Sequence, residues 1–98
     1  MTLNRWDAKR DATEPVVVDY LRACGALVQR LSTKDVPDLL VGLYGRWFLL
    51  ECKTGPKPLT EGQQVWLAAA RHKGLPVHVV RSLEDAEDVV RLLSRVAQ

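Results

Sequence analysis

Three side chains that could act together on a phosphate ester lie in one short stretch of the sequence, VPDLLVGLYGRWFLLECK, residues 36–53. Asp38 opens a strongly apolar run, and Glu51 and Lys53 close the next one. Charges are costly to bury without partners, so two carboxylates and an ammonium beside such runs require a reason. Paired carboxylates supply oxygen ligands for Mg²⁺ or Mn²⁺. A nearby ammonium can stabilise the charge that develops when a phosphodiester is hydrolysed.

The two apolar runs, residues 38–43 and 47–53, are predicted to be the strands of an antiparallel hairpin. Their apolar character is typical of buried strands, and the tightest connection between them turns at Tyr44 and Gly45. Asn-Gly is the stronger two-residue turn, so a longer loop with a bulge is the alternative connection.

The two-residue turn fixes which side chains share a face of the hairpin. Asp38 then lies directly opposite Glu51, with Cβ atoms about 5 Å apart. Lys53 is two residues further along and shares that face, whereas Cys52 points to the other. A slip of one residue would put the two carboxylates on opposite faces, so the candidate site depends on this register.

Each of these three residues also has an ordinary structural explanation. Asp38 follows a proline, and Pro-Asp is common in turns. Glu51 and Lys53 could form a surface ion pair at a solvated strand end, which contributes little stability. The hypothesis of a site therefore depends on the ordered set rather than on any one residue.

The remaining segments supply the elements that would hold the hairpin in place. In order, the sequence predicts a helix capped by Thr13 and ended by Gly25, strands at 26–31, 38–43 and 47–53, a helix with a Thr60–Gln63 capping box that ends at Gly74, a strand at 77–80, and a helix capped by Ser82. The third and fourth strands are joined by a helix and should be parallel. We therefore expect a mixed sheet flanked by helices, with the order α-β-β-β-α-β-α, in one α/β domain over residues 1–98. Residues 1–12 are expected to be a loose N-terminal segment.

Composition excludes several classes of protein. Apolar residues at 47% and charged residues at 27% are ordinary for a globular domain, and a net charge of +2 only weakly favours an anionic partner. No apolar run approaches the roughly 18 residues of a membrane span, so no membrane association is expected. The N-terminus lacks the apolar core of a signal peptide, which predicts a cytoplasmic rather than a secreted protein. Cys24 and Cys52 have no metal-ligand spacing and are expected to be small buried side chains.

Pro37-Asp38 followed by Glu51-Cys52-Lys53 is the PD-(D/E)xK pattern of a nuclease superfamily. The chain resembles the VRR-NUC (virus-type replication-repair nuclease) family of that superfamily from about Glu14 to Val90. The pieces that carry the resemblance are TEPVVVDYLRACGALV, VPDLLVG, LLECKTG, LTEGQQVWLAAARHKGLPVHVV and RSLEDA. Asp35 departs from it, since a glycine or small residue is expected just before the motif.

The resemblance implies a restriction-endonuclease-like core and roles for individual residues. Asp38 and Glu51 look like metal-binding carboxylates, with the backbone carbonyl of Cys52 as a further ligand, and Lys53 looks like the catalytic lysine. Gln63, three residues before a tryptophan, looks like the glutamine near the scissile phosphate. Glu14 looks like an outer or water-mediated metal ligand.

Two of these residues have simpler explanations that the sequence leaves open. Gln63 could serve only the capping box, in which case Gln64 is the substitute if the register slips. Glu14 could be a first-turn glutamate favoured by the helix dipole. His72 and His78 are not expected to take part in the site.

The resemblance also implies a magnesium- or manganese-dependent deoxyribonuclease acting on branched or junction DNA in replication, repair or recombination, in a phage or bacterial context. A homodimer is expected because coordinated cutting of two strands needs two sites. The candidate dimer surfaces comprise Leu3 and Trp6 near the N-terminus and Arg91, Arg95, Val96 and Ala97 in the last helix. The alternative for Trp6 is that it covers the core of its own domain. The alternatives are a catalytically inactive nucleic-acid-binding module of the same fold, and a small interaction domain whose charged cluster is accidental.

Overall fold

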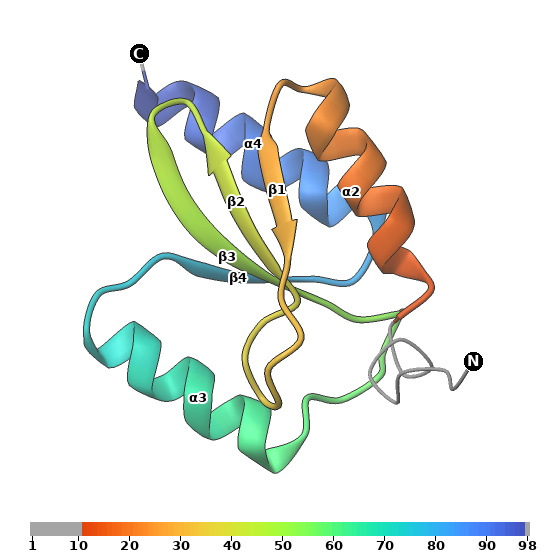
Figure 1. Cartoon of the computed structure of the whole chain (residues 1–98), viewed down its shortest axis with the longest axis vertical. Helices are drawn as coiled ribbons and strands as arrows, with labels where there is room; N and C mark the ends of the chain where they lie inside the picture. The colour runs from red at the N-terminus through yellow and green to blue at the C-terminus, as the bar shows by residue number, and fades with distance from the viewer. Residues whose placement is uncertain (1–10, 98) are drawn as a thin grey trace.

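The computed structural model describes residues 11–97 and shows a four-stranded mixed sheet with helices packed on both faces (Figure 1). In chain order, the elements are α2 (Thr13–Ala23), β1 (Leu27–Arg30), β2 (Leu39–Leu43), β3 (Arg46–Cys52), α3 (Glu61–His72), β4 (Val77–Val80) and α4 (Leu83–Ala97). This α/β fold confirms the predicted order α-β-β-β-α-β-α. The prediction for residues 1–10 lies outside the described residues.

The strands lie side by side in the order β1-β2-β3-β4. The pairs β1–β2 and β2–β3 are antiparallel, and β3–β4 is parallel, as expected for strands joined through α3. In the β2–β3 hairpin, Leu39 faces Leu50 and Leu43 faces Arg46, which confirms the predicted register. Tyr44 and Gly45 form the turn with φ of 53° and 73°, the positive values that a type I′ turn requires.

The helices divide the molecule into two unequal cores. Figure 1 shows α2 and α4 on one face of the sheet and α3 on the other. The larger core, under α2 and α4, includes Leu50 and Cys52 of β3, whereas the smaller one centres on Leu67 of α3 and takes in Leu49. Successive β3 side chains therefore alternate between the two helical layers. Cys52 enters the larger core, and Glu51 points to the side on which α3 begins.

The predicted capping residues are found at the starts of two of the three described helices. Thr60 and Gln63 form the predicted capping box of α3, and the Ser82 hydroxyl accepts a hydrogen bond from the Asp85 N–H, 3.2 Å away. The prediction that Thr13 caps α2 is wrong. Thr13 is already helical, and its hydroxyl lies 3.3 Å from that of Thr54, so a tertiary contact takes the oxygen that a cap would use.

Within residues 11–97, no helix is both long enough and apolar enough to cross a bilayer.

Candidate active site

Four of the residues singled out in the sequence meet where β3 ends and α3 begins. The Gln63 amide nitrogen donates a hydrogen bond to Oε2 of Glu51, 3.1 Å away, and the Lys53 ammonium lies 3.8 Å from the same oxygen. The Asp38 carboxylate accepts a 2.8 Å hydrogen bond from the Cys52 N–H. The antiparallel register therefore brings Asp38 and Glu51 to one end of the sheet, as predicted, and α3 adds Gln63.

Burial rules out one of the ordinary explanations. Glu51 and Lys53 are only 2% and 4% exposed, although they lie at a strand end. A solvated ion pair would leave both groups in water, whereas these two have lost most of their hydration. The pair is thus a buried charged cluster, which structures keep only where partners or ligands offset the loss of water.

The surroundings of Glu51 favour its uncharged form. Burial, followed by the negative charge of Asp38, raises the pKa of Glu51 to about 8, while the ammonium of Lys53 acts in the opposite direction. The ammonium of Lys53 therefore offsets only part of the cost of a charged Glu51 at this position. A bound divalent cation would favour the charged form of this carboxylate.

The Gln63 side chain takes part both in the capping box of α3 and in the contact with Glu51. Its side-chain oxygen accepts the Thr60 N–H at 2.9 Å, which completes the capping box, and its nitrogen donates to Glu51. Because the cap occupies the oxygen, only the N–H₂ group can face the carboxylate. Gln64 instead donates to the Leu59 carbonyl and is exposed, so Gln63 is the glutamine at the site.

Glu14 is buried at 2% exposure on the first turn of α2. Arg30 at the end of β1 forms an ion pair with it, with Nε 3.4 Å from Oε2, a partner that the sequence did not reveal. The charge of Glu14 also contributes to the raised pKa of the Cys52 thiol, so the carboxylate lies near the end of β3. This position is compatible with an outer role at the site.

Asp11 is a further carboxylate that sequence reasoning missed. It forms an ion pair with Lys57 at 3.9 Å, and its negative charge contributes to the raised pKa of both Glu51 and Cys52. The residue falls in a polar segment with no periodicity, which was expected to be loose. No sequence signal singles it out, because only the fold brings that segment to the end of β3.

The donor set can be compared with the needs of a metal ion. Within residues 11–97, no three side chains of His, Cys, Asp or Glu are grouped so as to hold an ion on their own. An ion here would therefore be held by Asp38 and Glu51, a backbone carbonyl and water. Oxygen ligands with several retained waters suit Mg²⁺.

Among known proteins, no family model and no curated protein matches the sequence. A solved structure described as a VRR_NUC domain does match, with a TM-score of 0.72 and 26% sequence identity, over 81% of this chain and 90% of that chain. The chain has the VRR-NUC fold. The resemblance seen in the sequence is thereby confirmed, and with it a fold of the nuclease family.

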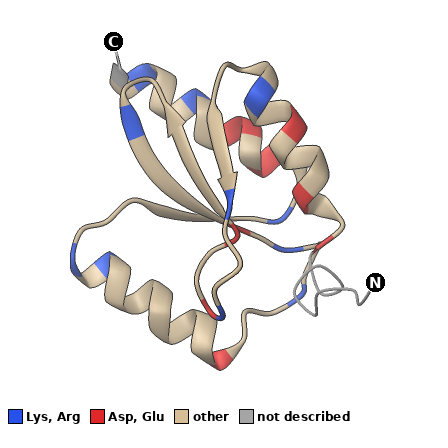
Figure 2. Ribbon diagram, viewed as in Figure 1, with Lys and Arg blue, Asp and Glu red and all other residues tan. Residues whose placement is uncertain are grey.

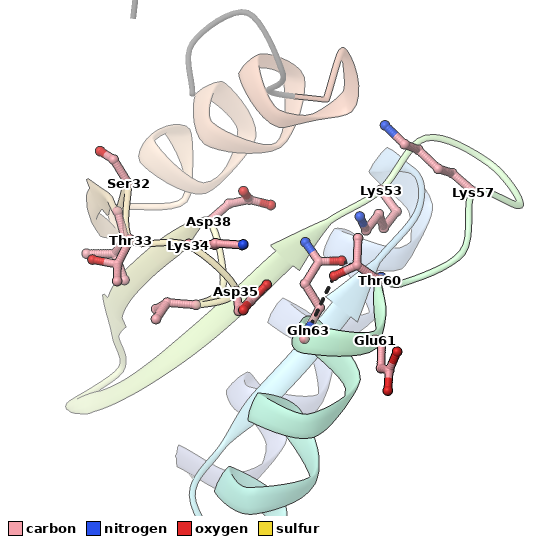
Figure 3. Close-up of a pocket in the computed structure, with 13 residues that line it drawn as sticks. Ser32, Thr33, Lys34, Asp35, Asp38, Lys53, Lys57, Thr60, Glu61 and Gln63 are labelled. Carbon is pink, nitrogen blue, oxygen red and sulfur yellow. Dashed lines mark hydrogen bonds between the residues drawn. The ribbon is translucent and has the colours of Figure 1, made fainter. Parts of the chain in front are cut away.

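A cavity of about 580 Å³ opens beside the carboxylates of this VRR-NUC fold. Residues 31–36 of the β1–β2 loop line one side, and the loop before α3 with the first turn of α3 lines the other (Figure 3). Asp38, Lys53 and Gln63 all contribute to its wall. The cavity therefore gives access to Asp38, Lys53 and Gln63, whereas Glu51 lies behind its wall.

The backbone conformation at Asp35 accounts for the glycine expected before the VRR-NUC motif. Its φ is 68°, in the left-handed region where glycine is least strained. The Asp35 carboxylate packs against Gly62, where an added Cβ would lie only 2.4 Å from it. The loop shape that Asp35 put in doubt is thus accommodated by the absence of a side chain on α3.

The cysteines and histidines around the VRR-NUC site fit structural roles. Cys52 is fully buried as a free thiol, and burial raises the pKa of this thiol far above its usual value, which makes it a poor nucleophile. Cys24 is also a free thiol and is partly buried. The His78 ring packs edge-on against Phe48 with centroids 5.9 Å apart, and burial lowers the pKa of this imidazole. His72 is exposed at the end of α3.

Proposed function

We propose that this protein is a divalent-metal-dependent nuclease that hydrolyses phosphodiester bonds of DNA. The single observation that carries the proposal is the burial of Glu51 beside Asp38 and Lys53, at the end of the sheet of a VRR-NUC fold. A stable core gains nothing from two repelling carboxylates in this place. In a site that binds a cation and then a phosphate, by contrast, both carboxylates have a use as ligands.

In this proposal, Asp38 and Glu51 hold Mg²⁺ or Mn²⁺, the Cys52 carbonyl is a further ligand, and Glu14 acts in an outer position through water. When bound, such an ion supplies a Lewis acid for the phosphoryl oxygen and lowers the pKa of a bound water. Gln63 keeps the Glu51 carboxylate oriented through its 3.1 Å hydrogen bond. Lys53 orients the attacking water or offsets the charge that develops on the phosphate.

The direct test is cleavage of a panel of linear, flapped and four-way DNA with Mg²⁺ and with Mn²⁺. The wild-type protein should cut at least one of these substrates, and EDTA should stop it. Asp38→Asn should remove cleavage and reduce metal binding measured by calorimetry, because an amide is a poorer ligand than a carboxylate. Equal Mg²⁺ binding by the two proteins would show that the metal site is misassigned. Binding of DNA without cleavage would favour the inactive module of the same fold.

We also propose that the nuclease works as a homodimer on branched DNA in replication, repair or recombination, in the cytoplasm and in a phage or bacterial context. Exposed apolar side chains on α4 support a contact surface there, since Leu92 and Val96 are each 52% exposed. Arg91, a predicted member of this surface, is paired with Asp88 at 2.8 Å, and Arg95 is exposed. Leu3 and Trp6, also predicted for this surface, lie outside the described residues, as does the side chain of Ala97.

Light scattering at micromolar concentration should report a mass of twice the 11.0 kDa chain. Two active sites in one particle can engage two duplex arms together, so four-way DNA should be cut faster than linear duplex. A monomer that cuts both substrates equally would overturn the dimer and the junction preference. The nuclease assignment itself would be unaffected by that result.

A further inference from the structure

Lysines gather around the pocket beside the candidate active site. Residues 11–97 contain four lysines, and three of them, Lys34, Lys53 and Lys57, line the 580 Å³ cavity. Figure 3 shows Lys34 on the β1–β2 loop and Lys57 on the loop before α3, with Lys53 between them. Figure 2 shows positive positions on both of these loops. The two outer lysines therefore flank the predicted catalytic lysine.

Both outer ammonium groups are available to an anion. Lys34 is exposed and has no ion-pair partner among the described residues. Lys57 is 56% exposed in its side chain, and its contact with Asp11 is long, at 3.9 Å. An ion pair of that length in water is weak and can be exchanged for a phosphate.

The loop that carries Lys57 is held in place before any ligand arrives. The Arg81 guanidinium donates hydrogen bonds from one nitrogen to the carbonyls of Gly55 and Lys57, and the Gly55 N–H donates back to the Arg81 carbonyl. Asp85 accepts the Arg81 backbone N–H at 2.8 Å. A loop ordered in advance loses less entropy on binding, so Lys57 is preorganised at the rim.

Besides Asp38, two carboxylates line this pocket, and their effect on a polyanion is partly offset. Asp35 packs against Gly62, and Glu61 belongs to the first turn of α3. Both lie by the N-terminus of a helix, whose unpaired N–H groups offset negative charge. The rims on either side carry the lysines.

We infer that Lys34 and Lys57 bind the phosphates on either side of the one that is cleaved, so that the pocket takes at least three consecutive phosphates of the strand being cut. This rests on the proposed function, which puts the cleaved phosphate by Asp38 and Lys53. The substrate is thus recognised as an extended phosphodiester strand with the scissile bond in its interior. A terminal phosphate would leave one of the two lysines without a partner.

The test is fluorescence anisotropy of a labelled DNA strand at several salt concentrations. Ca²⁺ replaces Mg²⁺, because it occupies oxygen sites with looser geometry and keeps the carboxylates from repelling the strand. Lys34→Gln and Lys57→Gln should each weaken binding by about fivefold and lower the salt slope by roughly 0.7 to 1. Lys73→Gln is the matched control, since Lys73 is exposed at the end of α3 and outside the pocket. It should change neither quantity.

Asp11→Asn provides a test of opposite sign. Removing the competing carboxylate should tighten binding of the strand by about twofold, because the Lys57 ammonium is then no longer paired with Asp11. Most of that gain should be lost in the Lys57→Gln background. The remainder reflects the negative charge of Asp11 near Glu51 and Cys52.

The outcomes separate this inference from the proposed function. Lys34→Gln and Lys57→Gln that bind like Lys73→Gln would overturn the inference, and so would a wild-type protein that does not bind the strand. The proposed function would still stand on cleavage with Mg²⁺. Conversely, the predicted loss of binding without any cleavage by Mg²⁺ or Mn²⁺ would keep the phosphate-binding rims and overturn the nuclease.

Discussion

Replacing Lys53 with alanine is expected to slow DNA cleavage on the order of 10²-fold or more, as for removing a preorganised donor from a transition state. The Lys53 ammonium is buried 3.8 Å from Glu51, where low exposure strengthens its effect on developing charge. Because an ammonium is not a metal ligand, Mg²⁺ binding should persist. Single-turnover cleavage and calorimetry on the same preparation would separate the two properties.

Two further variants make the Lys53 result specific. Lys53→Met keeps most of the side-chain volume and should be as slow as Lys53→Ala, which would exclude a packing defect as the cause. Lys73→Ala removes an exposed lysine outside the pocket and should cleave at the wild-type rate. Near-normal turnover by Lys53→Ala would leave this lysine as only the structural partner of Glu51.

Glu51→Gln is expected to stabilise the protein in the absence of divalent cations at alkaline pH. The pKa of Glu51 is raised from 4.5 to about 8, so the native state binds more protons than the unfolded chain between these values. Stability of the wild-type protein should therefore fall as pH rises through this interval. A glutamine keeps the acceptor for Gln63 but cannot ionise. Above pH 8 it should add about 1–3 kcal/mol to the free energy of unfolding, or about 5–15 °C in Tm.

Thermal unfolding at about pH 5 and about pH 8.5, in EDTA and in Mg²⁺, would check this prediction. Mg²⁺ should restore the wild-type protein at the higher pH and should do little for Glu51→Gln, which lacks one ligand. Glu84→Gln is the matched control, since Glu84 is exposed on α4 and should leave the pH dependence unchanged. Parallel pH profiles for wild type and Glu51→Gln would contradict the assignment of the raised pKa to a destabilising carboxylate.

The sequence predicted the hairpin well because its constraints were strong. A strand alternates its faces with a period of two, so the buried positions favoured one shared face for the carboxylates, and the structure has the register of the tighter of the two possible turns, at Tyr44 and Gly45. That register was sufficient to bring Asp38 to the same strand end as Glu51. Capping chemistry likewise predicted where α3 begins, whereas the place of Gln63 at the site was implied only by the resemblance to the VRR-NUC family.

The contacts that the sequence did not reveal all depend on tertiary packing. Asp11 reaches the site only because the start of α2 lies against the end of β3, and Arg30 meets Glu14 across two elements. The Thr13 hydroxyl was misread as a cap because its partner, Thr54, is far away in the chain. Periodicity and caps describe local structure, so they carry no signal for such pairs. The roles of the site residues in catalysis stay predictions until the variants are measured.

The contact between Asp35 and Gly62 makes these two positions a coupled pair for protein engineering. A methyl group at 62 would meet the Asp35 carboxylate, and the left-handed backbone at 35 accepts glycine with the least strain. In a library that randomises position 62 alone, the Asp35 carboxylate would therefore have to move in almost every member. Randomising both codons together would recover chains with glycine at 35 and a larger residue at 62. Such chains would keep the shape of the pocket with a different pair of residues, and its wall would carry one fewer negative charge.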